Sequence, residues 1–255
     1  VLMLLTGLVI LGGIKSIARA TSLLVPLMIV CYLIGGLLVL ALQLDKIPHA
    51  LGLIFQHAFS PAAAGGGFAG ATVAAAMRFG IARGVFSNES GMGSAPIAAA
   101  AARTTDPVKQ ALVSMTQTFI DTLVVCSMTA LVILTHSAWM EGVPAGQLTS
   151  ASFGAVLGQP GVLLVAVATA LFAGSTLIGW NYYGEKAIEY LLGPKSIKPY
   201  RVVFVCMVLV GSMMQLEFVW NFSDLMNGMM IIPNTIGLLL LSKVIKEETA
   251  RYFKW

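Results

Sequence analysis

Long apolar runs alternate with short polar connections along the chain. Runs of about 20 residues predict membrane-spanning helices, because that length crosses the hydrocarbon core of a bilayer. Residues 47–59 (IPHALGLIFQHAF) have an amphipathic pattern instead, which predicts a helix that lies at the outer surface or leads into the next segment. Seven membrane segments are expected: one that ends at Gly13, then residues 22–42, 60–79, 108–135, 161–183, 201–216 and 225–242.

The composition supports an all-α membrane protein. The chain is 58% hydrophobic and only 10% charged, whereas about a quarter of residues are charged in ordinary soluble domains, and its mean hydropathy is +0.88. No internal repeat is visible, so residues 1–255 are expected to form a single transmembrane domain. Because Val1 lies inside an apolar run, we expect a fragment that lacks its N-terminal part. Three cysteines in separate apolar segments are expected to be buried rather than bonded or metal-bound: Cys31, Cys126 and Cys206.

Basic residues alternate between the two sides of the expected topology. Fourteen of the fifteen lysines and arginines fall in every second connection, and Lys46 is the exception. Because positive charge is enriched in cytoplasmic loops, we expect a multi-pass protein of the cell membrane whose C-terminus is cytoplasmic. The net charge of +4 is then a topology signal and does not predict a nucleic-acid partner.

The segment at residues 60–79 contains residues that interrupt helices. A broken helix at membrane depth is stable only where protein surrounds it or where it lines a water-filled cavity, and transporters build substrate sites in this way. Phe68 would supply an apolar wall. The alternative is a close helix–helix crossing, because Gly66 and Gly70 satisfy the spacing of small residues at such crossings. The interrupting residues are Pro61, Gly65, Gly66, Gly67 and Gly70.

Residues 171–186 (LFAGSTLIGWNYYGEK) place Ser175 and Thr176 within an expected span, with Trp180 one helical turn after Thr176. Adjacent hydroxyl oxygens suit a sodium ion, because hard cations prefer oxygen ligands. Two alternatives remain open. The hydroxyls can bond to the preceding turn of their own helix, and Trp180 can anchor the helix at the membrane interface.

Asp121 is an acidic residue that we place well inside a span. Ionisable groups within membranes are functional by default. Gln117, Thr118 and Thr122 also offer local hydrogen-bond partners, so Asp121 belongs either to a structural polar cluster or to a proton or cation site. Asn234 in the last segment is expected to pack against polar partners.

The polar residues do not form the pattern of an enzyme. Ser94 is expected in a cytoplasmic loop and His136 at the outer end of the next span, about 30 Å away across the bilayer. A nucleophile and its base need hydrogen-bond reach. His49 and His57 lack a third metal ligand, and motifs for phosphate, zinc or thiol chemistry are absent from the sequence. We therefore expect a protein that is not an enzyme and that needs no cofactor.

Five stretches resemble one transporter family. Residues 84–125 closely resemble the hallmark stretch of the alanine or glycine:cation symporter family; they read GVFSNESGMGSAPIAAAAARTTDPVKQALVSMTQTFIDTLVV. The members of that family are bacterial and archaeal sodium-coupled amino-acid carriers. Four more stretches resemble that family in the same order: GGIKSIARATSLLVPLM (12–28), FSPAAAGGGFAGAT (59–72), STLIGWNYYGEKAIEYLLG (175–193) and WNFSDLMNGMMIIPN (220–234). The resemblance covers essentially the whole chain.

This resemblance implies part of a leucine-transporter-type fold, which contains two inverted repeats of five helices. The chain would correspond to about core helices 4 to 10, with the N-terminal helices missing. Ser175 and Thr176 would contribute to a sodium site, and the loop SNESGMGSAP (87–96) would cap the inner vestibule. The implied lining of the alanine or glycine pocket is Gly66, Gly67, Phe68, Gly70, Thr72 and Trp180.

The leading hypothesis is therefore a symporter that moves alanine or glycine into the cell with sodium by alternating access. Its partners would be the amino acid, the sodium ion and the lipid bilayer. A proton-coupled carrier on the same scaffold is the alternative. A channel is a weaker one, because the sequence contains nothing that resembles a selectivity filter.

Overall fold

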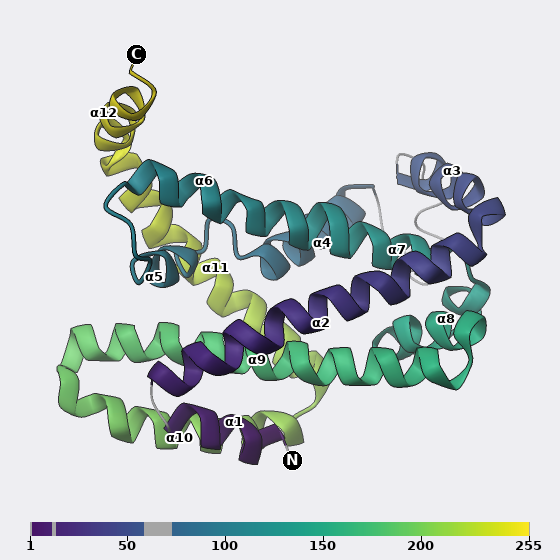
Figure 1. Ribbon diagram of the computed structural model, residues 1–255, viewed down its shortest axis with the longest axis horizontal. Coiled ribbons are helices and arrows are strands. Elements are labelled where there is room, and N and C mark those ends of the chain that lie inside the picture. Colours follow the sequence, from purple (N-terminus) through teal and green to yellow (C-terminus); the bar gives the residue numbers. More distant parts are fainter. Residues whose placement is uncertain (1, 12–13, 59–72, 255) are drawn as a thin grey trace. The chain divides into compact units, whose positions relative to one another are not determined.

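The computed structural model describes residues 2–11, 14–58 and 73–254 (Figure 1). Over these ranges the regular elements are all helical. In chain order they are α1 (Leu2–Leu11), α2 (Ile14–Leu42), η1 (Leu44–Lys46), α3 (Ile47–Ala58), α4 (Val73–Asn88), α5 (Ala95–Ala99), α6 (Pro107–Thr118), η3 (Phe119–Cys126), α7 (Ser127–Leu134), η4 (Ser137–Trp139), η5 (Ala145–Gln147), α8 (Leu148–Leu157), α9 (Gln159–Leu192), η6 (Pro194–Ser196), α10 (Ile197–Met213), α11 (Leu216–Leu240) and α12 (Ser242–Phe253).

Four of the described helical segments are long and apolar enough to cross a membrane. A fifth candidate is the pair α11 and α12, which bends by 61° at its break. These segments confirm the helical membrane class and agree with four of the seven expected segments, and the bent pair is a candidate for a fifth. The expected first segment is represented by α1, and the third extends beyond the described residues. The four unbroken candidates are Val25–Leu42, Pro107–Leu134, Gln159–Leu192 and Pro194–Met213.

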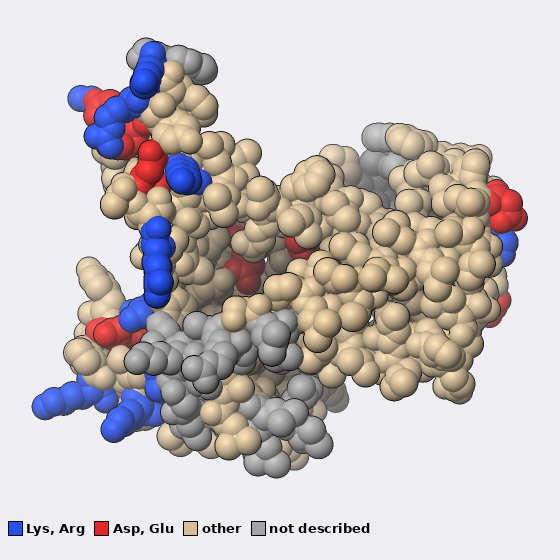
Figure 2. All heavy atoms as spheres, viewed as in Figure 1, with Lys and Arg blue, Asp and Glu red and all other residues tan. Residues whose placement is uncertain are grey.

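The surface agrees with that class. On the face drawn in Figure 2, side chains other than lysine, arginine, aspartate and glutamate predominate, and charged side chains gather on α12. The cysteines contradict the sequence-based expectation of burial, because Cys31, Cys126 and Cys206 are exposed. A helix in a membrane presents apolar residues on its outer face as well, so an apolar neighbourhood in the sequence does not predict burial there.

Two other boundaries differ from expectation. Helix α4 continues to Asn88 instead of ending near Phe79. It stops where Glu89, Gly91 and Gly93 adopt positive φ angles, a conformation that favours glycine. The connection after residue 135 also contains α8, which the sequence pattern did not predict because this helix is short.

The described chain divides into two compact units. Unit 1 contains Val1–Arg78 and Val125–Leu209, and its core lies where α2 packs against α9, with α7 and α8 alongside (Figure 1). Phe153 of α8 is completely buried in this core. Gly161 of α9 allows the close approach, because a Cβ atom there would lie 2.4 Å from the backbone oxygen of Phe153.

Tyr32 of α2 contacts neighbouring helices of unit 1 through both its aromatic ring and its hydroxyl group. Its ring stacks on Phe153 with 5.6 Å between centroids and meets the edge of Phe172 at 5.8 Å. Its hydroxyl lies 2.7 Å from the hydroxyl of Thr129 on α7. Aromatic pairs of this kind add to the stabilisation from buried area alone.

Unit 2 contains Phe79–Val124 and Val210–Trp255 and is organised differently. Helices α6, α11 and α12 have no buried residues. Met92 and Ser94, in the connection after α4, are buried instead. The elements of this unit are joined largely by polar contacts, which are described below.

Candidate functional site

The proposed amino-acid pocket falls mainly outside the described residues. Helix α3 ends at Ala58 and α4 begins at Val73. The predicted break in the helix therefore stays a prediction, as do the roles of its residues. The pocket residues that lie outside the described ranges are Gly66, Gly67, Phe68, Gly70 and Thr72.

The predicted sodium ligands lie on α9, which is one continuous helix. Gly158 precedes it with a φ of 66°, and Pro160 stands in its first turn, where a missing N–H is tolerated. Gly193, with a φ of 80°, ends the helix, and Pro194 prevents its continuation. Ser175 and Thr176 are therefore consecutive residues of one unbroken helix.

Ser175 and Thr176 differ in their surroundings. The Ser175 hydroxyl donates to the carbonyl of Phe172 at 3.0 Å, which is the local bond considered above as an alternative. This bond uses the hydroxyl hydrogen and leaves the oxygen lone pairs available to a cation. Thr176 is exposed. Trp180 follows on the same side of α9, and its ring meets the edge of Tyr183 with 5.9 Å between centroids.

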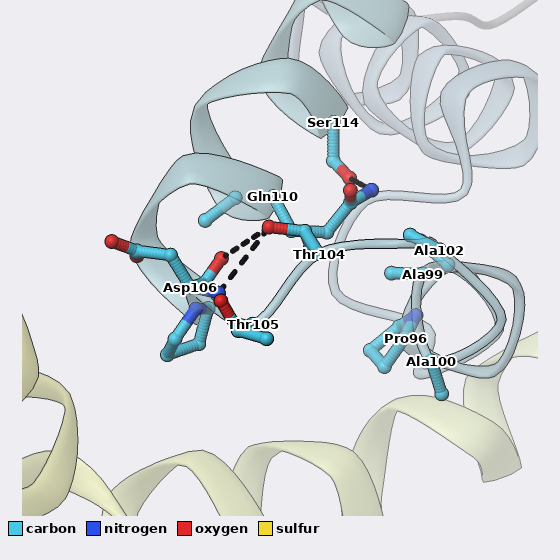
Figure 3. A pocket seen from close by; sticks show the side chains of 12 residues that line it. Pro96, Ala99, Ala100, Ala102, Thr104, Thr105, Asp106, Gln110 and Ser114 are labelled. Carbon is cyan, nitrogen blue, oxygen red and sulfur yellow. Dashed lines mark hydrogen bonds between the residues drawn. The ribbon is translucent and has the colours of Figure 1, made fainter.

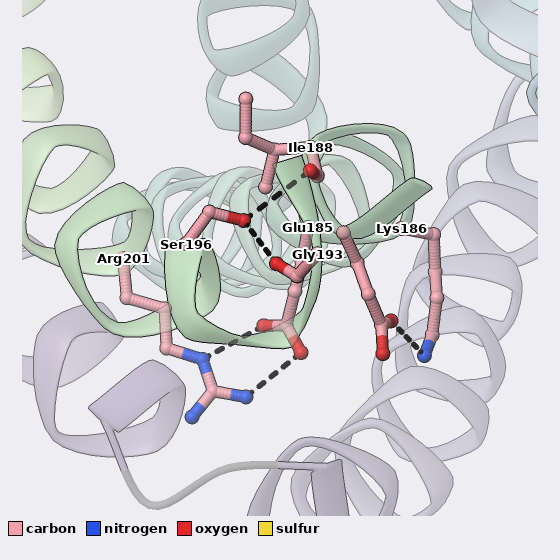
Figure 4. Close-up of polar contacts among 7 residues, drawn as sticks. Glu185, Lys186, Ile188, Gly193, Ser196 and Arg201 are labelled. Carbon is pink, nitrogen blue, oxygen red and sulfur yellow. Dashed lines mark hydrogen bonds and ion pairs between the residues drawn. The ribbon is translucent and has the colours of Figure 1, made fainter. Parts of the chain in front are cut away.

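The opposite side of α9 is buried and polar. Asn181 has no exposed surface, and both polar atoms of its amide lack a hydrogen-bond partner among the residues that the structure describes. One turn later, the Glu185 carboxylate accepts two hydrogen bonds from Arg201 of α10, at 2.7 and 2.8 Å (Figure 4). Arg201 is one of the fourteen basic residues that were expected in connections, so its pairing with Glu185 was not predicted. The signal was available, since a glycine–proline turn separates Glu185 and Arg201 and brings neighbouring helices together.

Asp121 lies in η3, a π-helical segment in the middle of the candidate span Pro107–Leu134. Ser87 of α4 donates a hydrogen bond to its Oδ2 atom at 2.7 Å, and the Thr122 hydroxyl donates to the same oxygen at 3.3 Å. Asn88 donates its side-chain N–H to the Thr122 hydroxyl at 3.0 Å. We call these four residues the Asp121 cluster. Thr122 was expected as a partner, whereas Ser87 and Asn88 were assigned to a loop because α4 was predicted too short.

The hallmark connection after α4 folds tightly within unit 2. The Ser94 hydroxyl is buried and donates to Glu89 at 2.7 Å. Ser90 and Thr118 bring their hydroxyls within 3.3 Å. The Asn234 side chain of α11 donates to the carbonyl of Gly91 at 2.8 Å, which confirms that Asn234 packs against a polar partner.

Arg83 of α4 provides a second link to α11. Its guanidinium forms an ion pair with Asp224. The same group lies 4.5 Å from the centroid of the Trp220 ring and 5.4 Å from that of Phe86. The electron-rich faces of the rings attract the guanidinium and help to hold it in place. Asp224 is therefore paired with a positive charge, whereas Asp121 contacts hydroxyl groups among the described residues.

A cavity of about 500 Å³ lies between α5 and the start of α6 (Figure 3). Alanines and prolines form its apolar wall, and its polar lining residues are Thr104, Thr105, Asp106, Gln110 and Ser114. The Asp106 carboxylate is already occupied, because it accepts hydrogen bonds from the backbone N–H groups of Val108 and Lys109 as the N-cap of α6. Gln110 bonds to Ser114 at 3.2 Å. These side chains are used locally, so the cavity does not resemble a ligand site.

Comparison with known proteins agrees with the resemblance found in the sequence. Residues 1–255 match the model of the sodium:alanine symporter family. A sodium/alanine symporter of Methanococcus maripaludis is 50% identical over 256 residues, which cover 99% of this chain and 55% of that protein. An uncharacterized transporter of Haemophilus influenzae is 47% identical, with 98% and 56% covered. An amino-acid carrier protein of Bacillus subtilis is 36% identical, with 100% and 54% covered. The chain thus spans about half the length of these relatives.

Proposed function

Because the chain belongs to the sodium:alanine symporter family, we propose that the complete protein imports alanine or glycine together with sodium. Membership in a transporter family agrees with the expectation that the protein is not an enzyme. The observation that carries the proposal is the family match over residues 1–255, together with 50% identity to a protein named as a sodium/alanine symporter.

The proposed sodium ligands are Ser175 and Thr176 on α9. Two adjacent hydroxyl oxygens on a rigid helix suit a hard cation, and the bond from Ser175 to Phe172 leaves its oxygen able to coordinate. Trp180 would form a wall of the amino-acid pocket one turn away. The other pocket residues would be Gly66, Gly67, Phe68, Gly70 and Thr72, whose small side chains and one aromatic ring suit a small zwitterion.

The proposed mechanism is alternating access on a leucine-transporter-type fold. Such carriers bind substrate and ion near the middle of the membrane, and one group of helices then rocks against another. The helices before α1 in the complete protein would supply the remaining ligands. The carrier would lie in the cell membrane with its C-terminus in the cytoplasm, as the distribution of basic residues predicts.

Uptake of labelled alanine by the complete protein in proteoliposomes tests this function. With a sodium gradient directed inward, alanine should accumulate, and replacing sodium with choline at constant pH should abolish the accumulation. Thr176→Ala should raise the sodium concentration needed for half-maximal uptake without lowering the yield of folded protein. An unchanged half-saturation in that variant would remove Thr176 from the ion site.

A proton-coupled carrier is the second candidate, because Asp121 is an ionisable residue within a candidate membrane span. An intramembrane carboxylate can carry a proton through a transport cycle. This candidate predicts that alanine uptake survives the replacement of sodium by choline and follows a pH gradient instead. The same choline experiment therefore separates the two candidates.

A further inference from the structure

We propose that Asp121 is the charged ligand of a second sodium site, formed with Ser87 and Thr122 and separate from the hydroxyl pair on α9. The inference deepens the proposed function and rests on it, since a sodium-coupled carrier is its premise. Three observations carry it: the depth of Asp121 in the membrane, its lack of a positive partner, and the oxygen atoms around it.

The length of the candidate span gives the depth that Asp121 has if Pro107–Leu134 crosses the membrane. Pro107–Leu134 has 28 residues, and Asp121 stands near its midpoint. At a rise of about 1.5 Å per residue the helix is about 42 Å long, whereas the hydrocarbon core is about 30 Å thick, so the midpoint lies at least about 9 Å inside either boundary. Ser87 is hydrogen-bonded to Asp121 and must lie at a similar depth, not in an aqueous loop.

The charge of Asp121 is not balanced by the side chains that the structure describes. Its contacts there are the hydroxyls of Ser87 and Thr122, and no described lysine or arginine pairs with it. Within the same unit Asp224 has Arg83, and in unit 1 Glu185 has Arg201. A carboxylate inside a membrane is costly unless a proton or a cation neutralises it. One monovalent ion would neutralise the single charge of the cluster.

The oxygen atoms of the cluster select the kind of ion. Carboxylate and hydroxyl oxygens are the ligands that hard cations prefer. Asp121 lies within the π-helical segment Phe119–Cys126, and π-helical turns occur frequently at functional sites because they alter the ordinary helical hydrogen bonds. A carbonyl oxygen of this segment would supply a further ligand. Two helices thus contribute oxygen atoms around one negative charge, which is the chemistry of a sodium site.

Counting bound ions tests the site directly. The complete carrier, purified in detergent and saturated with alanine, is equilibrated with ²²Na⁺, and the bound ions per carrier are measured. Asp121→Asn keeps the shape of the side chain and removes its charge, so it should bind one sodium ion fewer than the natural protein. Asp45→Asn removes an exposed carboxylate from η1 and should leave the count unchanged.

Two further variants keep the charge and remove one ligand each. Ser87→Ala and Thr122→Val should raise the sodium half-saturation about fivefold, as expected when one interaction of about 1 kcal/mol is lost. They decide the question if Asp121→Asn does not give monodisperse protein. Unchanged half-saturation in both variants would overturn the proposal.

The outcomes separate this inference from the proposed function. If the natural carrier, Asp45→Asn and Asp121→Asn all bind the same number of sodium ions with the same affinity, the second site is refuted and the proposed function stands. If the natural carrier binds no sodium, the proposed function fails. If Asp121→Asn keeps the sodium count but removes the pH dependence of alanine uptake, Asp121 carries a proton and the sodium assignment is wrong.

Discussion

Glu185 in unit 1 and Asp121 in unit 2 are both carboxylates within candidate membrane spans, yet their surroundings are opposite. Glu185 is buried and held by two hydrogen bonds from Arg201. Asp121 is half-buried and held by hydroxyl groups. In the first arrangement a guanidinium balances the carboxylate, whereas in the second no lysine or arginine of the described residues does. The difference teaches that an acidic residue in a membrane segment indicates a site only after its counter-charge has been sought.

The same contrast extends to the two units as they are described. Unit 1 buries an aromatic and aliphatic core around Tyr32 and Phe153, and its buried carboxylate Glu185 is paired with Arg201. Unit 2 has little buried apolar surface, and its helices meet through hydroxyl, amide and charged groups. We infer that the carboxylate in unit 1 stabilises the fold and that the carboxylate in unit 2 serves transport.

The largest effect on stability should follow from breaking the ion pair between Glu185 and Arg201. Arg201→Ala leaves Glu185 buried without its partner and should destabilise the complete carrier by about 3 kcal/mol. The loss of stability is measured by heating the carrier in detergent and recording, by size-exclusion chromatography, how much folded protein remains at each temperature. The double variant Glu185→Leu with Arg201→Met removes both charges and should recover most of the stability. A stable single variant would contradict a structural role for the pair.

A smaller effect is expected at Asp106, a carboxylate that is satisfied by backbone groups. Its two hydrogen bonds from the first turn of α6 cap that helix. Asp106→Ala should cost about 1 kcal/mol of stability, while Asp106→Ser should restore most of it, because serine also caps helices. Alanine uptake per folded carrier should stay unchanged in both variants. A selective loss of uptake would instead assign the neighbouring cavity a part in transport.

The smallest effect on stability is expected at Asp121 itself. In sodium-free buffer, Asp121→Asn should unfold at the same temperature as the natural carrier or slightly higher, since the substitution removes a charge that lacks a partner. The sign is opposite to that of Arg201→Ala. A fall as large as that of Arg201→Ala would show that Asp121 is a structural residue.

Hydrophobicity alone predicted the helical membrane class and seven segments, of which four agree with candidate spans and a fifth with the bent pair α11 and α12, because long apolar runs have few other physical outcomes. It singled out Asp121 and Asn234 for the same reason: polar groups are conspicuous in apolar segments. It missed Ser87 and Asn88, whose significance depends on where α4 ends, and Arg201, whose partner lies on another helix. The contacts of Ser87 and Asn88 join segments 34 residues apart and leave no local pattern, whereas the glycine–proline turn between Glu185 and Arg201 was a signal that could have been used.

The steepness with which alanine uptake rises with sodium concentration tests the central claim most directly. In proteoliposomes that contain the complete carrier, initial uptake should depend on sodium with a Hill coefficient above 1 in the natural protein, because two sites must be filled. The coefficient should fall to about 1 in Asp121→Asn and stay unchanged in Asp45→Asn. Equal steepness in all three proteins, or uptake that does not depend on sodium at all, would contradict the account.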